Sequence, residues 1–402
     1  MTDSFQEIQD RDRELILQTY ARYPLIVSRA SDTKLVDEQG RVYTDFLAGI
    51  SVCNLGHSHP ELVGVIREQA EKLIHVSNLF YQQEQLDLAD KLVATCSLEQ
   101  VFFCNSGAEA NEAAFKLARR YMRRVRNSSA YEIITLQDSF HGRTLATLTA
   151  TGQDKVKEGF DPLPEGFRQV PPEDLQAFRD AVSERTAGVM LEVVQGEGGV
   201  WPLSRDYLLG VQKICREQGI LFMVDEVQTG LGRTGTMWAH QHYRLTPDVV
   251  TVAKGLGNGL PVGAMLATRH AGQGFDPGSH AATFGGNPLV CRVASKVLEI
   301  LERDAMCLRN REKQDLAFRL FNGIQKRWPE RIENTRGLGL MLGIELAWGG
   351  KEVWQELLRR GYVCNLVQGN TLRLLPPFTI TEQEIEDFAR TLELALEATE
   401  GK

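Results

Sequence analysis

The sequence predicts an α/β fold, with a large domain on a mainly parallel mixed sheet and a smaller α+β domain. Three observations predict it: strand-like and helical segments alternate, several strand-like runs are continuously apolar, and a long helical periodicity replaces this alternation beyond about Val293. Alternation favours a parallel sheet, and continuous apolar runs suit strands that are covered on both faces. A chain of 402 residues is too long for one ordinary core, which indicates a large domain plus a smaller one.

The N-terminal segment, residues 1–50, is expected to pack with the small domain. It contains a β-like pair, Lys34–Asp37 and Arg41–Thr44, around a glycine turn. The pair alone is compatible with packing on either domain. We expect the large domain to span residues 51–292 and the small domain residues 293–402.

The large domain is predicted to alternate short apolar strands with helices that have one apolar face. The predicted strands are Val101–Cys104, Glu132–Leu136, Ala187–Val194, Ile220–Val224 and Val249–Ala253. The predicted helices are Glu109–Arg124 and Arg205–Gln218, and Gly219 is a normal C-terminal stop for the second one.

The small domain begins with a long helical periodicity that runs from about Val293 to Trp328. A strand-like segment from Gly339 to Leu346, a short helix, the strand Leu372–Leu375 and a last helix follow. Thr381 and Glu384 form a capping box that predicts the start of this last helix.

Composition excludes some classes of function. The net charge of −8 argues against binding to nucleic acid or to an anionic membrane surface. The seven cysteines are odd in number and form no CxxC motif, which favours reduced thiols. The polar N-terminus has no apolar segment typical of a signal peptide, and no stretch approaches a membrane span. We therefore expect a cytoplasmic enzyme.

Asp225 and Lys254 stand at the ends of two apolar runs and are 254 − 225 = 29 residues apart. A carboxylate and an amine at the ends of adjacent buried strands suit pyridoxal phosphate. This cofactor needs a lysine for its Schiff base and an acid that keeps its pyridine nitrogen protonated. The charged pair makes the ring an electron sink for carbanion chemistry.

Polar or glycine-rich sequence follows other predicted strands too, at the edge where open parallel sheets bind ligands. The clusters are Asn105–Ala108, Phe140–Arg143, Glu192–Glu197 and Asp225–Gln228, with Lys254 as a fifth strand end. One such cluster would be weak support for a site, whereas five in one sheet are strong support.

Each cluster has a functional and an ordinary interpretation. Ser106–Ala108 could hold a phosphate on free N–H groups at a helix start, or form a plain turn. The absence of GxGxxG there disfavours a dinucleotide site. Phe140 could stack on a flat cofactor or belong to the core, and Arg143 could bind a carboxylate or lie on the surface.

Three further positions carry chemical alternatives. Glu197 could meet a cationic substrate end or hold Arg373, since an arginine in an apolar strand is costly unless paired. Thr283 stands in a glycine turn and could offer its hydroxyl to a phosphate. His57 and His59 precede a proline and suit a turn better than a metal site, because no further ligand stands at metal-binding spacing.

Taken together, the ordered motifs resemble the class III, ornithine-type aminotransferases, which use pyridoxal phosphate. The resemblance covers nearly the whole chain. Its motifs are Asp45–Phe46 with Gly49–Ile50, Leu55–Pro60, Asn105–Ala114, Phe140–Arg143, Gln195–Gly199, Asp225–Gly230, Ala253–Gly255, Thr283–Asn287 and Leu372–Leu374. The family implies fold type I and a homodimer with shared active sites.

The resemblance also implies the residues that hold the cofactor. Lys254 would form the Schiff base and shuttle the proton, and Asp225 would pair with the pyridine nitrogen. Gln228 would bond the phenolic oxygen and Phe140 would stack on the ring. The other implied contacts are Glu226 and Val227, with Gly107 and Ala108 on the phosphate, where Thr283 of the second subunit joins them.

For the substrates, the family implies that Arg143 binds the α-carboxylate of the amino donor. Arg373 would be released from Glu197 to take the α-carboxylate of 2-oxoglutarate or glutamate, and Tyr23 would line the pocket. Ala282 stands where a serine is frequent, so a hydroxyl contact to the substrate cannot be carried over from the family, though a backbone contact of Ala282 could be.

Within the family, Glu112–Arg119 and Leu372–Pro377 are most similar to the branch that acts on N2-acetylornithine in arginine biosynthesis. Ornithine, succinylornithine, succinyl-diaminopimelate and 4-aminobutyrate remain alternative donors. Mutase or decarboxylase chemistry on a related fold is a second alternative, and a cofactor-free binding protein is a third. The retained Asp225 and Lys254 argue against the last of these.

Overall fold

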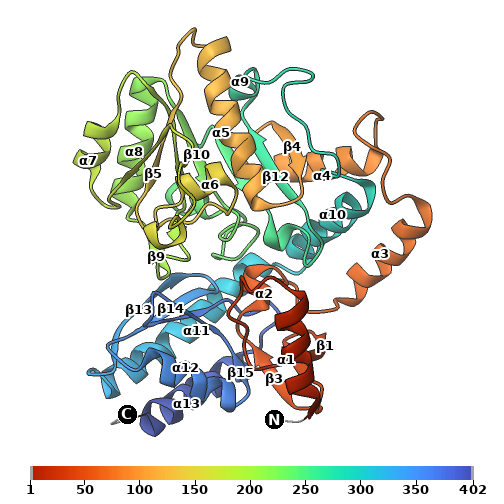
Figure 1. Cartoon of the computed structure of the whole chain (residues 1–402), viewed down its shortest axis with the longest axis vertical. Coiled ribbons are helices and arrows are strands. Elements are labelled where there is room, and N and C mark those ends of the chain that lie inside the picture. Colours follow the sequence, from red (N-terminus) through yellow and green to blue (C-terminus); the bar gives the residue numbers. More distant parts are fainter. Residues whose placement is uncertain (1–2, 400–402) are drawn as a thin grey trace.

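The computed structural model describes residues 3–399. Figure 1 shows a larger upper body around a central sheet and a smaller lower body that contains both ends of the chain. Among the described residues, no helix has the length and apolar character needed to cross a membrane.

The central sheet has seven strands in the order β4-β12-β11-β10-β7-β5-β6. Neighbouring strands from β11 to β6 are parallel, whereas β12 runs antiparallel to both β11 and β4. The strands are β4 (Gln100–Cys104), β5 (Glu132–Leu136), β6 (Phe167–Val170), β7 (Thr186–Leu191), β10 (Leu221–Asp225), β11 (Val249–Val252) and β12 (Gly263–Ala267). The two strands that precede Asp225 and Lys254, β10 and β11, are therefore adjacent and parallel.

Helices pack around this sheet, and two of them show why the sequence folds this way. The side chain of Ser106 caps α5 (Gly107–Arg124) by accepting a hydrogen bond from the Glu109 N–H, and an alanine-rich face of the helix is buried. Gly219 ends α8 (Arg205–Gln218) in the left-handed conformation. The other helices of this body are α3 (Pro60–Lys72), α4 (Gln83–Val93), α6 (Leu145–Ala150), α7 (Leu175–Ala181), α9 (Arg269–Gly272) and α10 (Pro288–Arg303).

The lower body holds two four-stranded sheets. One has the order β13-β14-β17-β16, with β13 (Ile332–Leu338), β14 (Met341–Leu346), β16 (Asn365–Val367) and β17 (Thr371–Leu374). Its helices are α11 (Met306–Arg327), α12 (Gly350–Arg359) and α13 (Glu382–Ala398), and the Thr381–Glu384 capping box starts α13 as predicted.

The second sheet joins the two ends of the chain. Its order is β1-β2-β3-β15, with β1 (Val27–Ser31), β2 (Lys34–Asp37), β3 (Val42–Asp45) and β15 (Tyr362–Val363). The last two strands pair in parallel. The N-terminal strands therefore bond to a strand near the C-terminus, although the domain boundaries at residues 50 and 292 stay a prediction. The remaining elements are α1 (Asp3–Leu15), α2 (Ala48–Ser51), β8 (Val194–Gln195), β9 (Trp201–Pro202) and three short 3₁₀ turns.

Two predicted elements differ from those observed. The strand expected to reach Val194 stops at Leu191, and Val194 begins the separate strand β8. The helical stretch expected from Val293 to Trp328 is two helices, because the chain turns at Ala305, whose φ is +50°.

Candidate active site

A cavity of about 450 Å³ opens beyond the carboxyl ends of the central strands. Asp225, Lys254 and Phe140 line it together, which places the predicted carboxylate, amine and aromatic ring around one space. The other predicted residues in its wall are Gly107, Ala108, Arg143, Val227 and Gln228, and Glu192 and His141 line it as well.

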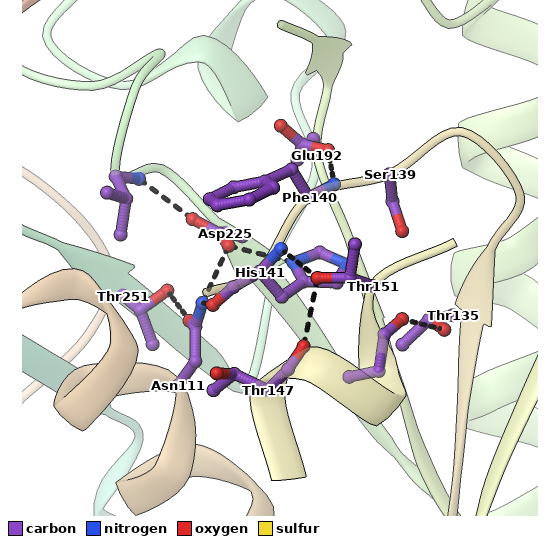
Figure 2. Close-up of polar contacts among 12 residues, drawn as sticks. Asn111, Thr135, Ser139, Phe140, His141, Thr147, Thr151, Glu192, Asp225 and Thr251 are labelled. Carbon is purple, nitrogen blue, oxygen red and sulfur yellow. Dashed lines mark hydrogen bonds and ion pairs between the residues drawn. The ribbon is translucent and has the colours of Figure 1, made fainter. Parts of the chain in front are cut away.

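Asp225 ends β10 and is 4% exposed. Its Oδ2 atom accepts hydrogen bonds from Asn111 Nδ2 and His141 Nδ1, both at 2.8 Å. Its Oδ1 atom accepts the Val227 N–H at 3.0 Å. Figure 2 shows Asn111 and His141 reaching the carboxylate from α5 and from the loop after β5. The three donors fix the orientation of the carboxylate, because its two oxygen atoms are held from different directions.

His141 is fully buried beside Asp225. Burial by itself would lower the pKa of His141, but the Asp225 carboxylate outweighs burial and the net pKa is raised. The raised pKa favours the positive imidazolium of His141 next to the negative Asp225 carboxylate. The two opposite charges are therefore buried as a pair.

Lys254 follows β11, and its backbone φ of +42° begins a short 3₁₀ turn, Lys254–Leu256. Its ammonium makes no side-chain hydrogen bond within residues 3–399. Burial is the main cause of a lowered pKa for Lys254, opposed by the charges of Glu197 and Asp225. A lysine whose ammonium form is destabilised is a better nucleophile and base at neutral pH.

The first turn of α5 brings backbone N–H groups to the cavity at Gly107 and Ala108. A Cβ atom on Gly107 would lie 2.7 Å from Val227 Cγ1, closer than carbon atoms can pack. Glycine therefore lets the helix start approach the residue two positions after Asp225. A helix N-terminus of this kind attracts an anion such as a phosphate.

Phe140 is held by its backbone, since its N–H donates to Glu192 Oε2 at 3.0 Å. Its ring also lies 5.5 Å from the guanidinium carbon of the exposed Arg143. Glu192 is almost fully buried, and burial raises its pKa to about 7. The carboxyl group of Glu192 thus fixes the loop after β5 that presents the Phe140 ring (Figure 2).

Arg373 and Glu197 form an ion pair next to this cavity. Arg373 stands on β17 with 1% of its surface exposed, and its Nη1 donates to Glu197 Oε1 at 2.5 Å and to Gln228 Oε1 at 3.4 Å. Burial would raise the pKa of Glu197, but Arg373 outweighs it and the net pKa is lowered. The sequence-predicted partnership of these two residues is present in the structure.

Besides Glu197 and Arg373, four predicted site residues lie outside the cavity wall. Thr283 is exposed, and the Ala282 carbonyl accepts a hydrogen bond from Asn78 Nδ2 at 3.2 Å. The Tyr23 hydroxyl donates to the Cys364 carbonyl at 3.1 Å. Glu226 is fully buried, and its carboxylate accepts hydrogen bonds from Thr229, Ala239 and His240, so its side chain anchors the following loop.

A family model described as aminotransferase class-III matches residues 17–396. The chain belongs to the class III aminotransferases. An acetylornithine aminotransferase of Methanocaldococcus jannaschii is 41% identical to it over 384 residues, covering 96% of this chain and 96% of that protein.

Two solved structures also match this class III aminotransferase. The ornithine aminotransferase from Toxoplasma gondii has a TM-score of 0.94 at 29% identity, covering 98% and 95% of the two chains. The acetylornithine aminotransferase from Elizabethkingia anophelis has a TM-score of 0.88 at 29% identity, covering 98% and 99%.

These matches confirm the predicted fold type I and the predicted cofactor, pyridoxal phosphate. The residues of this aminotransferase fit that group. Around the cavity lie the buried carboxylate of Asp225, the aromatic ring of Phe140 and the amine of Lys254, which has no hydrogen-bond partner in the described chain. The N-terminus of α5 also reaches the cavity, because Gly107 has no Cβ atom that would clash with Val227. In the solved Toxoplasma gondii structure, pyridoxal phosphate partially occupies the active site.

The geometry singles out three residues in this class III aminotransferase whose contacts were not predicted. Asn111 is the polar residue on the buried alanine face of α5, a signal that could have marked it. His141 belongs to the predicted cluster Phe140–Arg143, but its ion pair with Asp225 was not predicted. Asn365, which bonds Arg373, lies in a three-residue strand where no periodic pattern can be read.

Proposed function

We propose that this enzyme transfers the terminal amino group of N2-acetyl-L-ornithine to 2-oxoglutarate, giving N-acetylglutamate 5-semialdehyde and glutamate. The identity of the donor is supported by the acetylornithine aminotransferase of Methanocaldococcus jannaschii, with which the chain shares 41% identity over 96% of each length. The two-substrate exchange is supported by one observation in the site, the buried Glu197–Arg373 pair beside the cofactor cavity.

When bound, pyridoxal phosphate supplies an electron sink that stabilises negative charge at the carbon next to the substrate nitrogen. Asp225 would hold a proton on the pyridine nitrogen, and Asn111 and His141 orient its carboxylate. Gln228 would bond the phenolic oxygen, Phe140 would cover one ring face, and the N–H groups of Gly107 and Ala108 would bind the phosphate.

Lys254 would hold the cofactor through its Nζ atom, and the same Nζ would carry the proton that leaves the donor carbon. Burial lowers the pKa of Lys254, so its neutral form is accessible for this transfer near neutral pH.

The substrates differ in where their carboxylates need to bind. Arg143 is exposed at the cavity wall and takes the α-carboxylate of the acetylated donor. Arg373 takes the α-carboxylate of 2-oxoglutarate or glutamate, and Glu197 neutralises Arg373 while the donor occupies the site. We place Tyr23 on the Arg373 side of the substrate pocket, since Asn365 bonds both residues.

A homodimer with shared active sites completes the proposal. Leu79, Phe80, Tyr81 and Phe284 are exposed by 86%, 62%, 103% and 61% respectively, beside the turn that carries the exposed Thr283. The two segments are tied together, since Asn78 Nδ2 donates to the Gly285 carbonyl at 2.8 Å. Exposed apolar clusters of this kind are typical of protein interfaces, and a second copy would present Thr283 to the neighbouring phosphate site.

We place this reaction in arginine biosynthesis in the cytoplasm. The location is supported by the cysteines, since all seven are free thiols and none is fully exposed, as is normal in a reducing compartment. The acetyl group marks the donor as a biosynthetic intermediate, because it blocks cyclisation of the semialdehyde product onto the α-amine.

The test is a panel of amino donors with 2-oxoglutarate as acceptor, ranked by kcat/KM. The donors are N2-acetylornithine, ornithine, N2-succinylornithine, succinyl-diaminopimelate and 4-aminobutyrate. We expect N2-acetylornithine to rank first and glutamate to accumulate in step with it. A higher rank for any other donor contradicts the proposed substrate, and a reaction that yields no glutamate contradicts the transamination itself.

A further inference from the structure

Arg373 has more hydrogen-bond partners than the ion pair with Glu197 requires. Its Nη2 atom donates to Asn365 Oδ1 at 2.6 Å, while Nη1 serves Glu197 and Gln228. Its Nε atom is buried and has no acceptor within residues 3–399. A buried guanidinium N–H without an acceptor is costly, so the site has one strong donor left for a carboxylate oxygen.

Asn365 and Arg373 are fixed to each other by the backbone. They are directly paired across the antiparallel strands β16 and β17, which sets their side chains side by side. Glu197, in contrast, follows β8 on a glycine-rich turn of the upper body. The contact with Asn365 therefore does not depend on where Glu197 lies, whereas the contact with Glu197 can be exchanged.

Tyr23 sets the orientation of the Asn365 amide. Asn365 Nδ2 donates to the Tyr23 hydroxyl at 3.1 Å, and that hydroxyl donates to the Cys364 carbonyl at 3.1 Å. The Tyr23 ring packs edge-on against Trp354 with centroids 4.8 Å apart. Because the Nδ2 atom of Asn365 is bonded to Tyr23, the Oδ1 atom of the same amide faces Arg373.

We propose that Asn365 is a positioning residue that holds the Arg373 guanidinium by Nη2 while the carboxylate of Glu197 is exchanged for that of glutamate or 2-oxoglutarate. This inference rests on the proposed function and adds the residue that orients the acceptor arginine. It follows that Asn365 governs recognition of the dicarboxylate substrate and leaves recognition of the acetylated donor, at Arg143, unaffected.

The decisive variant is Asn365→Asp, which keeps the size of the side chain and gives Arg373 a permanent second carboxylate. L-glutamate and N2-acetylornithine are added separately to the purified holoenzyme, and loss of the visible Schiff-base absorbance is followed. Both donors react with the same enzyme form, so only their recognition differs. We call the second-order rate constant for this loss of absorbance the efficiency with each donor. We expect the efficiency with glutamate to fall about 10- to 100-fold, the value of one buried charge-assisted hydrogen bond. We expect the efficiency with N2-acetylornithine to change less than about threefold.

A second variant removes the hydrogen bond without adding charge. Asn365→Leu leaves Nη2 without its acceptor, and we expect a loss of about tenfold with glutamate and again little change with N2-acetylornithine. A purely steric role for Asn365 predicts wild-type behaviour of this variant, and that result overturns the inference. Equal losses with both donors in either variant overturn it too.

Asn370→Asp is the matched control. It adds the same charge in the turn between β16 and β17, where the Asn370 side chain contacts Thr371 rather than Arg373. We expect it to keep the wild-type ratio of the two efficiencies, and a loss with glutamate equal to that of Asn365→Asp overturns the inference. A wild-type holoenzyme that responds to neither donor contradicts the proposed function and this inference with it.

Discussion

His141 Nδ1 lies 2.8 Å from Asp225 Oδ2, and the two side chains form an ion pair almost without solvent contact. The histidine therefore stabilises the charge that Asp225 offers to the pyridine nitrogen. His141→Leu removes that partner at nearly constant volume and leaves Asn111 Nδ2 and the Val227 N–H as the donors to Asp225. We expect cofactor affinity and kcat each to fall roughly tenfold, as for loss of one charge-assisted hydrogen bond. Equilibrium titration with pyridoxal phosphate and steady-state rates measure both, and unchanged affinity contradicts the role.

Lys254→Ala is expected to abolish the visible Schiff-base absorbance of the purified protein. Turnover should fall by at least about a thousandfold, because nucleophile and proton carrier are removed together. Absorbance spectra and the donor assay check the two effects on one sample. Undiminished transamination by this variant would exclude Lys254 as the cofactor lysine.

Gly107→Ala tests the close approach of α5 to the cofactor cavity. The added Cβ would meet Val227 Cγ1 at 2.7 Å, so one of the two must move. We expect weaker binding of pyridoxal phosphate, measured by titration of the apoenzyme. The double variant Gly107→Ala with Val227→Ala removes the obstructing methyl groups, and partial recovery of affinity is the expected result. No recovery would contradict the assignment of the effect to the contact with Val227.

Glu192 gives the folded protein a specific pH dependence. Burial raises its pKa from an ordinary 4.5 to about 7, beside His141 and Asp225. The folded state then binds more protons than the unfolded state between these values, so stability falls as the pH rises from about 4.5 and levels off above about 7.

Glu192→Gln mimics the protonated form, and its melting temperature relative to wild type should rise over that window. Thermal melts from pH 5 to 8 measure this, with Glu217→Gln, at an exposed position, as the control. A difference that does not vary with pH contradicts the shifted pKa.

Much of the fold and the centre of the site follow from local patterns in the chain. The strand Glu132–Leu136 and the helix Arg205–Gln218 match β5 and α8 residue for residue, because apolar period and the Gly219 stop act locally. Asp225 and Lys254 were predictable as neighbours because parallel strands bring their carboxyl ends to one edge.

The parts that were not predicted depend on contacts between distant residues. No local period indicates that Asn365 will oppose Arg373, since β16 has three residues and its pairing is set by the hairpin turn. His141 is followed by glycine in a loop, and only the tertiary fold brings it to Asp225. β12 was not anticipated as an antiparallel strand within the sheet, because a run of apolar residues carries no direction.

The parallel pairing of β3 with β15 has a consequence for how the polypeptide matures. Thr44 pairs with Tyr362, a separation of 362 − 44 = 318 residues. The hairpin of β2 and β3 therefore leaves the ribosome long before its neighbour exists, and the outer edge of β3 stays open while the residues up to Tyr362 are made. Open strand edges recruit other chains, so this stretch is where nascent molecules are most prone to associate wrongly. Closure of that edge waits until Tyr362 and Val363 have left the ribosome and can pair with Thr44 and Asp45.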